Sequence, residues 1–142
     1  MKKKVLIVIA NYYGHISTSL NTDAQMALNY AKIKYSIKEV PGVFEIPTVI
    51  SRNIKKYDGF IALGCVIKGE TPHFDYISKT TFDGLMKLSI ENKKPIGNGI
   101  ITALNKEQAY ARMGDAERQK KLSKEKGKGE EAAKAVIAVL SQ

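Results

Sequence analysis

The sequence is poor in the residues that build disulfides and metal sites. Its 142 residues include one cysteine, Cys65, no tryptophan and only two histidines, His15 and His73. A single cysteine excludes an intramolecular disulfide, and so few thiol and imidazole groups argue against a metal site built from them. We therefore expect no metal and a reducing, cytoplasmic environment. The longest apolar run, Val5–Ala10, is far shorter than a membrane-spanning helix requires, so we expect no membrane segment.

Acidic residues are also scarce relative to basic ones. The 14 Asp and Glu face 23 Lys and Arg, which gives a net charge of +9. Such an excess suggests an anionic partner: nucleic acid, acidic lipid or a phosphorylated small molecule. Counted by segment, however, the charge is spread thinly, and the lysine-rich tract 114–131 holds six basic and five acidic side chains. We interpret this tract as a solvated loop or helix face and expect neither nucleic acid nor a membrane as partner.

Apolar runs rich in β-branched residues alternate with helix-like segments along the chain. The expected strands are Val5–Ala10, Tyr35–Val40, Phe60–Ile67 and Pro95–Thr102. The expected helices cover residues 17–31, 47–55, 71–91, 106–113 and 130–140, with Ser17 or Thr18 as the first cap. This alternation predicts a single α/β domain over residues 1–142, a three-layer α/β/α sandwich with a four-stranded parallel sheet. In such folds the functional residues gather beyond the carboxyl ends of the strands.

The most informative stretch is Gly64–Tyr76, which reads Gly-Cys-Val-Ile-Lys-Gly-Glu-Thr-Pro-His-Phe-Asp-Tyr. It begins in a predicted buried strand and ends in a predicted helix, with Lys68–Thr71 at the junction. Gly69 allows a ligand to approach the backbone closely, and a helix start offers unpaired N–H groups and the positive end of a dipole. These features predict a phosphate site, although the spacing of a Walker loop is missing. An ordinary helix N-cap at Thr71 is the alternative interpretation.

Five further positions near the strand ends carry side chains that could take part in binding or catalysis. His73 could exchange protons beside the phosphate site, or it could be a surface residue. Glu45, between apolar neighbours, could accept hydrogen bonds from a polyol or an amine. Alternatively, its carboxylate could stabilise the positive end of the dipole of the following helix. Tyr12 and Tyr13 could stack on a planar heterocycle or cover the end of the sheet. Cys65 lies in an apolar strand, and we interpret it as an inert core residue rather than a nucleophile.

Three motifs taken together resemble the lumazine synthase family, the 6,7-dimethyl-8-ribityllumazine synthases. They are Gly64–Tyr76, Pro41–Pro47 (Pro-Gly-Val-Phe-Glu-Ile-Pro) and Gly99–Ala109 (Gly-Ile-Ile-Thr-Ala-Leu-Asn-Lys-Glu-Gln-Ala). The resemblance covers nearly the whole chain and implies a flavodoxin-like fold. It also implies an enzyme that condenses 5-amino-6-(D-ribitylamino)uracil with 3,4-dihydroxy-2-butanone 4-phosphate, the penultimate step of riboflavin biosynthesis. An imine forms, phosphate leaves, and ring closure with loss of water gives the lumazine, without a metal or redox cofactor.

The resemblance also implies roles for individual residues. His73 matches the family's proton-transfer histidine, and Arg112 matches a phosphate ligand that a neighbouring subunit contributes. The positions that match substrate contacts are Tyr12, Val43, Phe44, Glu45, Cys65, Val66, Ile67, Gly69, Glu70 and Thr71, with Asn98 and Lys128 from the neighbour. Because the family's pocket lies between subunits, the resemblance implies a homo-oligomer that binds two small-molecule substrates. Riboflavin synthase is a candidate further partner.

Some positions depart from the family's pattern. Asn11–Tyr13 stands where Arg-Phe-Asn or Arg-Trp-Asn is usual, and Asn98 stands where an aromatic residue is common. The segment between Arg112 and Lys128 is longer than in the family's shell-forming members, so Lys126 is an alternative to Lys128. A long loop at this place obstructs closure of an icosahedral shell. We therefore expect a pentamer rather than a capsid.

Two other functions compete with the enzyme. A non-catalytic protein of the same fold could sequester a flavin or a lumazine, but it has no evident need for both His73 and Arg112. A nucleic-acid-binding α/β domain would carry a patch of a single sign and would bind with a steep salt dependence, whereas the lysine-rich tract is mixed in sign.

Overall fold

The structure, a computed structural model, describes residues 2–114 and 127–142, so that most of the lysine-rich tract, including Lys126, lies outside the described residues. All four predicted strands are present. They are β1 Lys4–Ala10, β2 Lys34–Val40, β3 Gly59–Ile67 and β4 Ile96–Ala103. The helices are α1 Gly14–Tyr30, α2 Ile46–Arg52, α3 His73–Asn92, α4 Lys106–Arg112 and α6 Lys128–Leu140, and a 3-10 turn, η1, covers Val43–Glu45.

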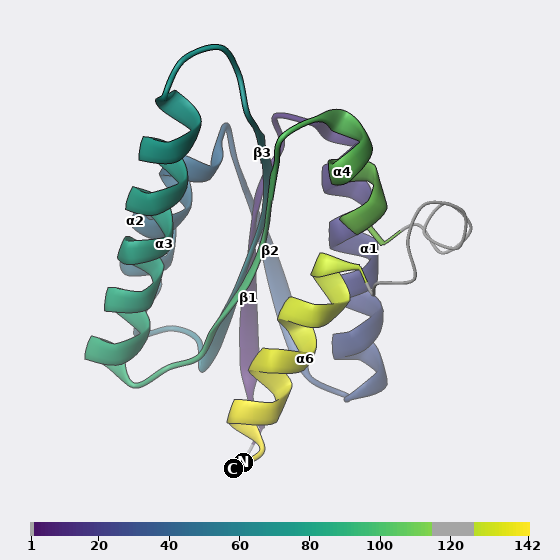
Figure 1. Ribbon diagram of the computed structural model, residues 1–142. Helices are drawn as coiled ribbons and strands as arrows, with labels where there is room; N and C mark the ends of the chain where they lie inside the picture. Colours follow the sequence, from purple (N-terminus) through teal and green to yellow (C-terminus); the bar gives the residue numbers. More distant parts are fainter. Residues whose placement is uncertain (1, 115–126) are drawn as a thin grey trace.

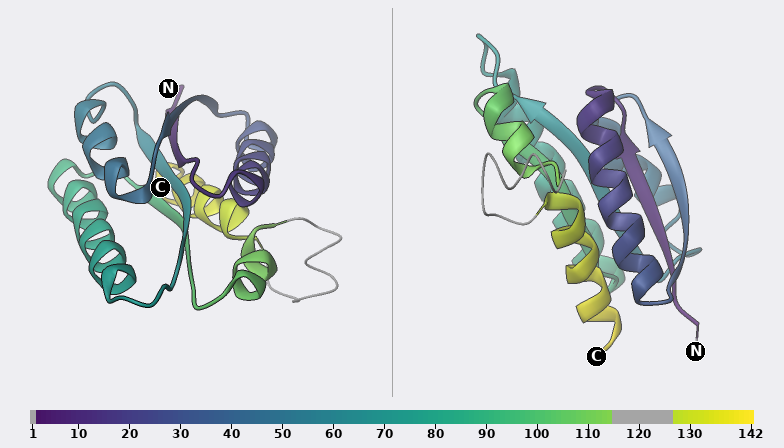
Figure 2. Two further views of the ribbon diagram at one scale, coloured as in Figure 1. Left: turned by 90° about the horizontal axis from the view of Figure 1, so that it is seen from above. Right: turned by 90° about the vertical axis from the view of Figure 1, so that its right-hand side faces the viewer.

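The strands form one parallel sheet in the order β2-β1-β3-β4. Helices α2 and α3 cover one face of the sheet, while α1, α4 and α6 cover the other (Figure 1). The right-hand view of Figure 2, in which this second face is turned toward the viewer, shows α1 beside α6. The predicted three-layer α/β/α sandwich is thus confirmed. Because all strands run in one direction, their carboxyl ends share one edge of the sheet, at the top of Figure 1, and their amino ends share the opposite edge.

The sheet separates two apolar cores, because side chains alternate along each strand. In β1, Val5, Ile7 and Ile9 pack toward α1 and α6, whereas Leu6 and Val8 pack toward α2 and α3. All five are at most 4% exposed. Burial on both faces explains why β1 has a continuous apolar sequence rather than an alternating one. The two cores hold the central strands in place and so position the loops that leave their carboxyl ends.

The first helix begins earlier than predicted. Helix α1 starts at Gly14, with Tyr13 in the N-cap position and no side-chain cap hydrogen bond. The Ser17 hydroxyl instead donates to the buried carbonyl of Ala10 at 2.7 Å, and the Thr18 hydroxyl donates to the carbonyl of Gly14 at 2.9 Å. The prediction of Ser17 or Thr18 as the cap is therefore wrong, since both hydroxyls bond to carbonyls that precede them in the chain.

Two further boundaries differ from the prediction. Helix α3 begins at His73, with Pro72 in the N-cap position, rather than at Thr71. Helix α2 ends at Arg52 rather than near Lys55, and a turn follows before β3. Among the described residues, no helix combines the length and apolar character that crossing a bilayer demands.

Candidate active site

A cleft of about 520 Å³ opens at the carboxyl edge of the sheet. Four segments form it: the connection after β1, the η1 turn after β2, the end of β3, and the loop that leads into α3. Most of the predicted site residues line this cleft, namely Tyr12, Val43, Phe44, Glu45, Cys65, Val66, Ile67, Gly69, Thr71 and His73. The parallel sheet thus gathers segments that are far apart in the sequence at the edge where its strands end.

Two tyrosines form the wall that follows β1. The rings of Tyr12 and Tyr13 meet edge to face, with centroids 4.9 Å apart and an interplanar angle of 80°. Tyr12 is 75% exposed and offers its ring to a ligand, whereas Tyr13 packs against the core at the start of α1. Burial, followed by the neighbouring Cys65 and Tyr12, raises the pKa of Tyr13. The edge-to-face contact therefore joins an anchored ring to an exposed one at the mouth of the cleft.

The η1 turn brings Val43, Phe44 and Glu45 to the cleft. Val43 is buried and fills space next to Gly64 of β3, where a Cβ would lie only 2.6 Å from Val43 Cγ1. Gly64 therefore allows the turn to pack closely on the end of the strand. Phe44 and Glu45 are both exposed, so an aromatic face and a carboxylate are available to a ligand beside the tyrosines.

The end of β3 supplies Cys65, Val66 and Ile67 to the lining. Cys65 and Ile67 pack toward the core under α1 and α6, and Val66 packs toward the opposite core. Burial raises the pKa of the Cys65 thiol to about 12. A thiol that stays protonated at neutral pH is a poor nucleophile, which agrees with the interpretation of Cys65 as an inert residue.

The loop Lys68–Pro72 forms the polar end of the cleft. Among the described residues, no atom lies within 4 Å of the position that a Cβ on Gly69 would take, so the backbone there is open to a ligand. Pro72 occupies the N-cap position of α3, and the interpretation of Thr71 as a side-chain cap is therefore wrong. Thr71 lines the cleft instead. The loop presents its backbone beside the positive end of a 20-residue helix, which is the arrangement that an anion site needs.

His73 is the first residue of α3 and lines the same end of the cleft. Its side chain is exposed rather than enclosed in the core. An imidazole in this position can accept a proton from a bound molecule or donate one to it. The fold therefore places an imidazole directly next to the candidate phosphate loop.

Arg112 and Asn98 do not line the cleft. Arg112 lies at the end of α4, on the other side of the sheet from α2 and α3, and its Nη1 donates to the carbonyl of Gln108 at 2.9 Å. Asn98 is exposed on the edge strand β4, and its Oδ1 accepts a hydrogen bond from the N–H of Ile100 at 3.1 Å. A single chain therefore does not bring these two side chains to the other site residues.

Lys128 and Glu70 are the remaining predicted residues that do not line the cleft. Lys128 begins α6, and its Nζ lies 3.4 Å from Oε1 of Glu131. Glu70 belongs to the candidate phosphate loop and is exposed between Gly69 and Thr71. Its neighbours Gly69 and Thr71 line the cleft, but the Glu70 side chain is not part of the lining.

The prediction also missed lining residues. Gly42, Phe74 and Ile77 contribute to the cleft, and Tyr13, left open as a stacking or covering residue, does so too. Phe74 and Ile77 could have been found from the sequence, because they follow His73 by one and four residues in the same predicted helix. Gly42 carries no comparable signal beyond its place in the Pro-Gly turn.

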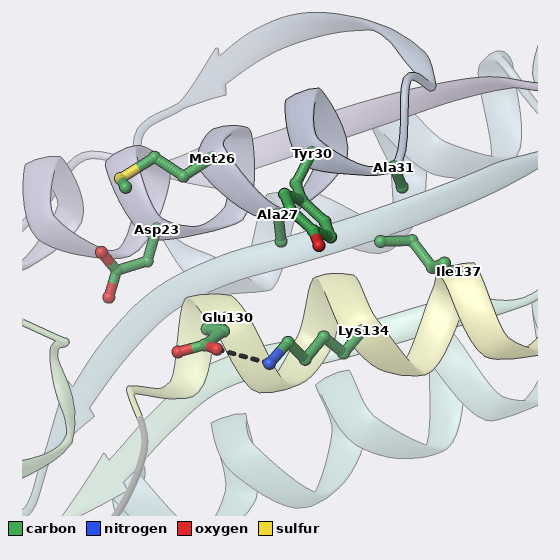
Figure 3. A pocket seen from close by; sticks show the side chains of 8 residues that line it. All are labelled: Asp23, Met26, Ala27, Tyr30, Ala31, Glu130, Lys134 and Ile137. Atoms are coloured by element: carbon green, nitrogen blue, oxygen red, sulfur yellow. Dashed lines mark ion pairs between the residues drawn. The ribbon is translucent and has the colours of Figure 1, made fainter.

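A second hollow, of about 620 Å³, lies between α1 and α6 (Figure 3). Met26 and Tyr30 on α1 and Ile137 on α6 give it apolar walls, and Glu130 and Lys134 form an ion pair of 2.6 Å at its side. None of the predicted site residues lines this hollow. The cleft at the carboxyl edge, where the motifs Pro41–Pro47 and Gly64–Tyr76 meet, is therefore the candidate active site.

Comparison with known proteins agrees with the motifs in this cleft. The family model described as 6,7-dimethyl-8-ribityllumazine synthase matches residues 2–142. The 6,7-dimethyl-8-ribityllumazine synthase of Bartonella henselae is 42% identical over 144 residues, which cover 99% of this chain and 88% of the relative. The protein of the same name from Agrobacterium fabrum is 41% identical over 126 residues, which cover 84% of this chain and 85% of the relative.

A third relative extends the comparison. The 6,7-dimethyl-8-ribityllumazine synthase 1 of Rhodopseudomonas palustris is 40% identical over 146 residues, which cover 96% of this chain and 83% of the relative. These matches span the fold and all three motifs rather than one segment. The chain therefore belongs to the 6,7-dimethyl-8-ribityllumazine synthase family of enzymes.

Proposed function

We propose that the protein condenses 5-amino-6-(D-ribitylamino)uracil with 3,4-dihydroxy-2-butanone 4-phosphate to 6,7-dimethyl-8-ribityllumazine, releasing phosphate and water. This is the penultimate step of riboflavin biosynthesis and needs no metal or redox cofactor. The observation that carries the proposal is the composition of the cleft. It joins an exposed aromatic ring, a carboxylate, an open glycine loop at a helix start and a histidine.

Each part of the cleft suits one part of the two substrates. The Tyr12 ring offers a flat face for the pyrimidine, and Glu45 offers a carboxylate that accepts hydrogen bonds from the hydroxyls of the ribityl chain. The backbone of Gly69–Thr71, at the start of α3, suits the phosphate of the ketone. The amine and the carbonyl then lie between these two anchors. Holding two reactants in this way can contribute about 7–11 kcal/mol to lowering the barrier.

His73 is the proton carrier in this proposal. Attack of the amine nitrogen on the ketone carbonyl requires that a proton leave the nitrogen and that the carbonyl oxygen depart as water. Elimination of phosphate breaks the C–O bond and takes a proton from the adjacent carbon, and the second ring-closing condensation releases another water. The imidazole of His73, beside the phosphate loop, can carry protons between these atoms. Such a group contributes typically about 10²–10⁴-fold to the rate.

We also propose that the active unit is a homopentamer with sites between neighbouring subunits. Arg112, Asn98 and Lys128 lie outside the cleft of their own chain, so a neighbour is the natural source of these groups. A guanidinium can bind phosphate oxygens through two parallel hydrogen bonds, which gives Arg112 the role of a phosphate ligand. The exposed apolar residues Tyr76, Met86 and Ile90 on α3 support a covered subunit contact, since that helix buries only Thr81 and Leu85. The pentamer rather than a shell follows from the long segment before α6.

The proposed setting is the cytoplasm, where the single buried cysteine stays reduced. Riboflavin synthase, which would consume the lumazine, is the proposed partner that receives the product.

The direct test is an absorbance or fluorescence assay for lumazine formation from the two purified substrates. We expect turnover with the wild type and a loss of about 100-fold or more in kcat for His73→Ala. Arg112→Ala should raise the KM for the ketone phosphate. Absence of lumazine from the wild type would refute the reaction. Wild-type turnover in both variants would refute the assignment of the site.

A further inference from the structure

The structure shows a charge distribution that the sequence does not reveal. In a parallel sheet, all segments that lead into strands meet at the amino edge, the lower end of the molecule in Figure 1. Lysines occupy every one of these segments. We call them the lysine edge: Lys2, Lys3 and Lys4 at β1, Lys32 and Lys34 at β2, Lys55 and Lys56 at β3, and Lys93 and Lys94 at β4. The segments that leave the strands at the other edge carry only Glu45, Lys68 and Glu70 as charged residues.

Contacts between the segments bring these lysines together. Lys4 and Lys34 are register partners in neighbouring strands. The Nζ of Lys94 donates to the carbonyl of Ile54 at 2.6 Å and so joins the start of β4 to the segment that holds Lys55. At a strand spacing of about 4.8 Å, four strand starts span about 14 Å. The lysine edge is therefore a compact row of cations across the whole sheet.

Acidic side chains do not neutralise this row. Within the described part of the chain, no residue of the lysine edge takes part in a salt bridge. Asp58 lies among them, and its carboxylate, which accepts the backbone N–H of Lys4 at 2.8 Å, offsets only one of the nine positive charges. Glu91, in the last turn of α3, is also acidic, but its Oε1 lies 4.0 Å from Nζ of Lys87, which is not part of the lysine edge. The Nζ of Lys4 lies 4.8 Å from the ring centroid of Tyr57, and the Nζ of Lys94 is bonded to Ile54. The ammonium groups of the other seven lysines remain available to an external anion.

Stabilisation of the helix dipoles does not account for the lysine edge either. Helices α1, α2, α3 and α6 end at this side of the sheet, and each helix end carries about half a negative charge. Four ends amount to about two negative charges, against nine lysines. An excess of positive charge remains after this structural role is satisfied.

The surface is also shaped to receive a partner. An open hollow of about 670 Å³ lies at the edge between α1 and the starts of β1 and β2, and its lining includes Lys4, Lys32 and Lys34. The half-buried ring of Tyr35 also lines it, and the Tyr35 hydroxyl donates to Oε1 of Gln25 at 3.1 Å. A basic groove with an adjacent aromatic ring is the combination that binds the backbone and the bases of single-stranded nucleic acid.

We propose that the lysine edge binds single-stranded nucleic acid, as a function separate from catalysis. The segments that lead into the strands carry lysines, and a single arginine, Arg52 at the end of α2, lines a hollow with Lys56. The edge therefore offers mainly point charges to phosphates rather than a bidentate reading of bases, and the binding is independent of sequence. A membrane surface fits less well, because the isoleucines next to the lysines, Ile33, Ile54 and Ile96, pack into the cores instead of facing outward. This inference replaces the expectation, drawn from charge counts along the sequence, that nucleic acid is not a partner.

The test uses fluorescence anisotropy of a short labelled oligothymidylate titrated with the full-length protein at several salt concentrations. The edge variant combines Lys2→Gln, Lys34→Gln and Lys55→Gln, three exposed lysines from three strand starts. The control variant combines Lys79→Gln, Lys106→Gln and Lys134→Gln, which removes the same charge elsewhere on the exposed surface. Neither set includes a residue of the cleft, so lumazine formation should be unchanged in both.

We expect the wild type to bind the oligonucleotide and the edge variant to bind at least about tenfold more weakly, with the control within about twofold of the wild type. The slope of log K against log salt should become shallower by about 2 in the edge variant, since each lost phosphate contact on a single strand removes about 0.7. Lack of binding at low salt would overturn the proposal. So would equal losses in the two variants, or binding to anionic phospholipid vesicles without binding to the oligonucleotide.

Discussion

At the scale of single residues, what is missing at a position can matter as much as what is present. Gly69 has open space where a side chain would extend, and Gly64 has a valine from another segment in that space. The first glycine leaves room for a ligand, whereas the second leaves room for the protein itself. The two positions look equivalent in the motif Gly64–Tyr76, and only the structure separates their roles.

Gly69→Ala should therefore impair binding without affecting folding. The added methyl group meets no described atom within 4 Å, so we expect an unchanged Tm. If the phosphate lies against this backbone, the methyl group displaces it, and the KM for the ketone phosphate should rise about tenfold or more while the KM for the pyrimidine stays the same. Steady-state kinetics with each substrate varied in turn measures both values. An unaltered KM for the ketone phosphate would show that the phosphate binds elsewhere.

Burial of Cys65 should make the protein less stable as the pH rises above about 9. Its ordinary thiol pKa of 9.0 rises to about 12 in the folded chain because of burial. The folded state thus keeps a proton that the unfolded state releases, so the stabilisation is complete below about pH 9 and is lost as the pH rises toward 12. Between about pH 8 and pH 10, the free energy of unfolding of the wild type should fall by about 1 kcal/mol more than that of Cys65→Ala. Urea denaturation at the two pH values measures this, and parallel decreases in both proteins would contradict it.

At the scale of helices and strands, contacts between segments that are far apart in the sequence decide which elements could be predicted from the sequence and which could not. The strands were predictable because burial on both faces leaves a continuous apolar run, as in Val5–Ala10. The start of α1 was not, because Ser17 looks like a cap in the sequence but bonds to Ala10 in the core. The cleft was largely predictable from its motifs, whereas Arg112 and Asn98 were assigned by resemblance alone and do not reach it within one chain.

The contact between β4 and α6 gives a prediction at this scale. A Cβ on Gly97 would collide with the backbone carbonyl of Ala132 in α6, which cannot move like a flexible side chain. Gly97→Ala should therefore destabilise the fold by about 1–3 kcal/mol. Gly84, within α3, has only ordinary contacts with Pro47 at 3.5 Å, so Gly84→Ala should leave stability unchanged or raise it by up to about 1 kcal/mol. Thermal unfolding of the two variants decides the point, and a neutral Gly97→Ala would contradict the close packing.

At the scale of the whole molecule, the fold places the candidate active site and the lysine edge at opposite edges of the sheet. The cleft lies where the strands end, and the lysine edge lies where they begin. Counts along the sequence spread the positive charge evenly, because each lysine pair precedes a different strand. A parallel topology then stacks these pairs side by side. No periodicity within one segment could predict this gathering, since it depends on the order of four segments in space.

A mixed assembly tests whether neighbouring subunits share a site. Oligomers formed from equal amounts of His73→Ala and Arg112→Ala chains should contain roughly a quarter of sites with both wild-type groups, since each group comes from a different subunit. Lumazine synthesis should then recover to about that fraction of the wild-type rate, although each variant alone is impaired. Native mass spectrometry establishes that the chains have mixed and that five copies assemble. Mixed oligomers without recovery would place Arg112 in the same subunit's site or outside it.

The lysine edge should also orient the protein when it adsorbs to a negatively charged solid. On a sulfonated cation-exchange bead, the protein should attach by the ends of the strands that carry the lysines and leave the opposite end, with the cleft, toward the liquid. We expect the immobilised enzyme to keep most of its lumazine-forming activity, and the edge variant to elute at lower salt than the control variant of equal net charge. Elution of both variants at the same salt concentration would mean that retention depends only on the net charge of the protein. Oriented in this way, the protein could be used as a surface catalyst without a tag or a chemical linker.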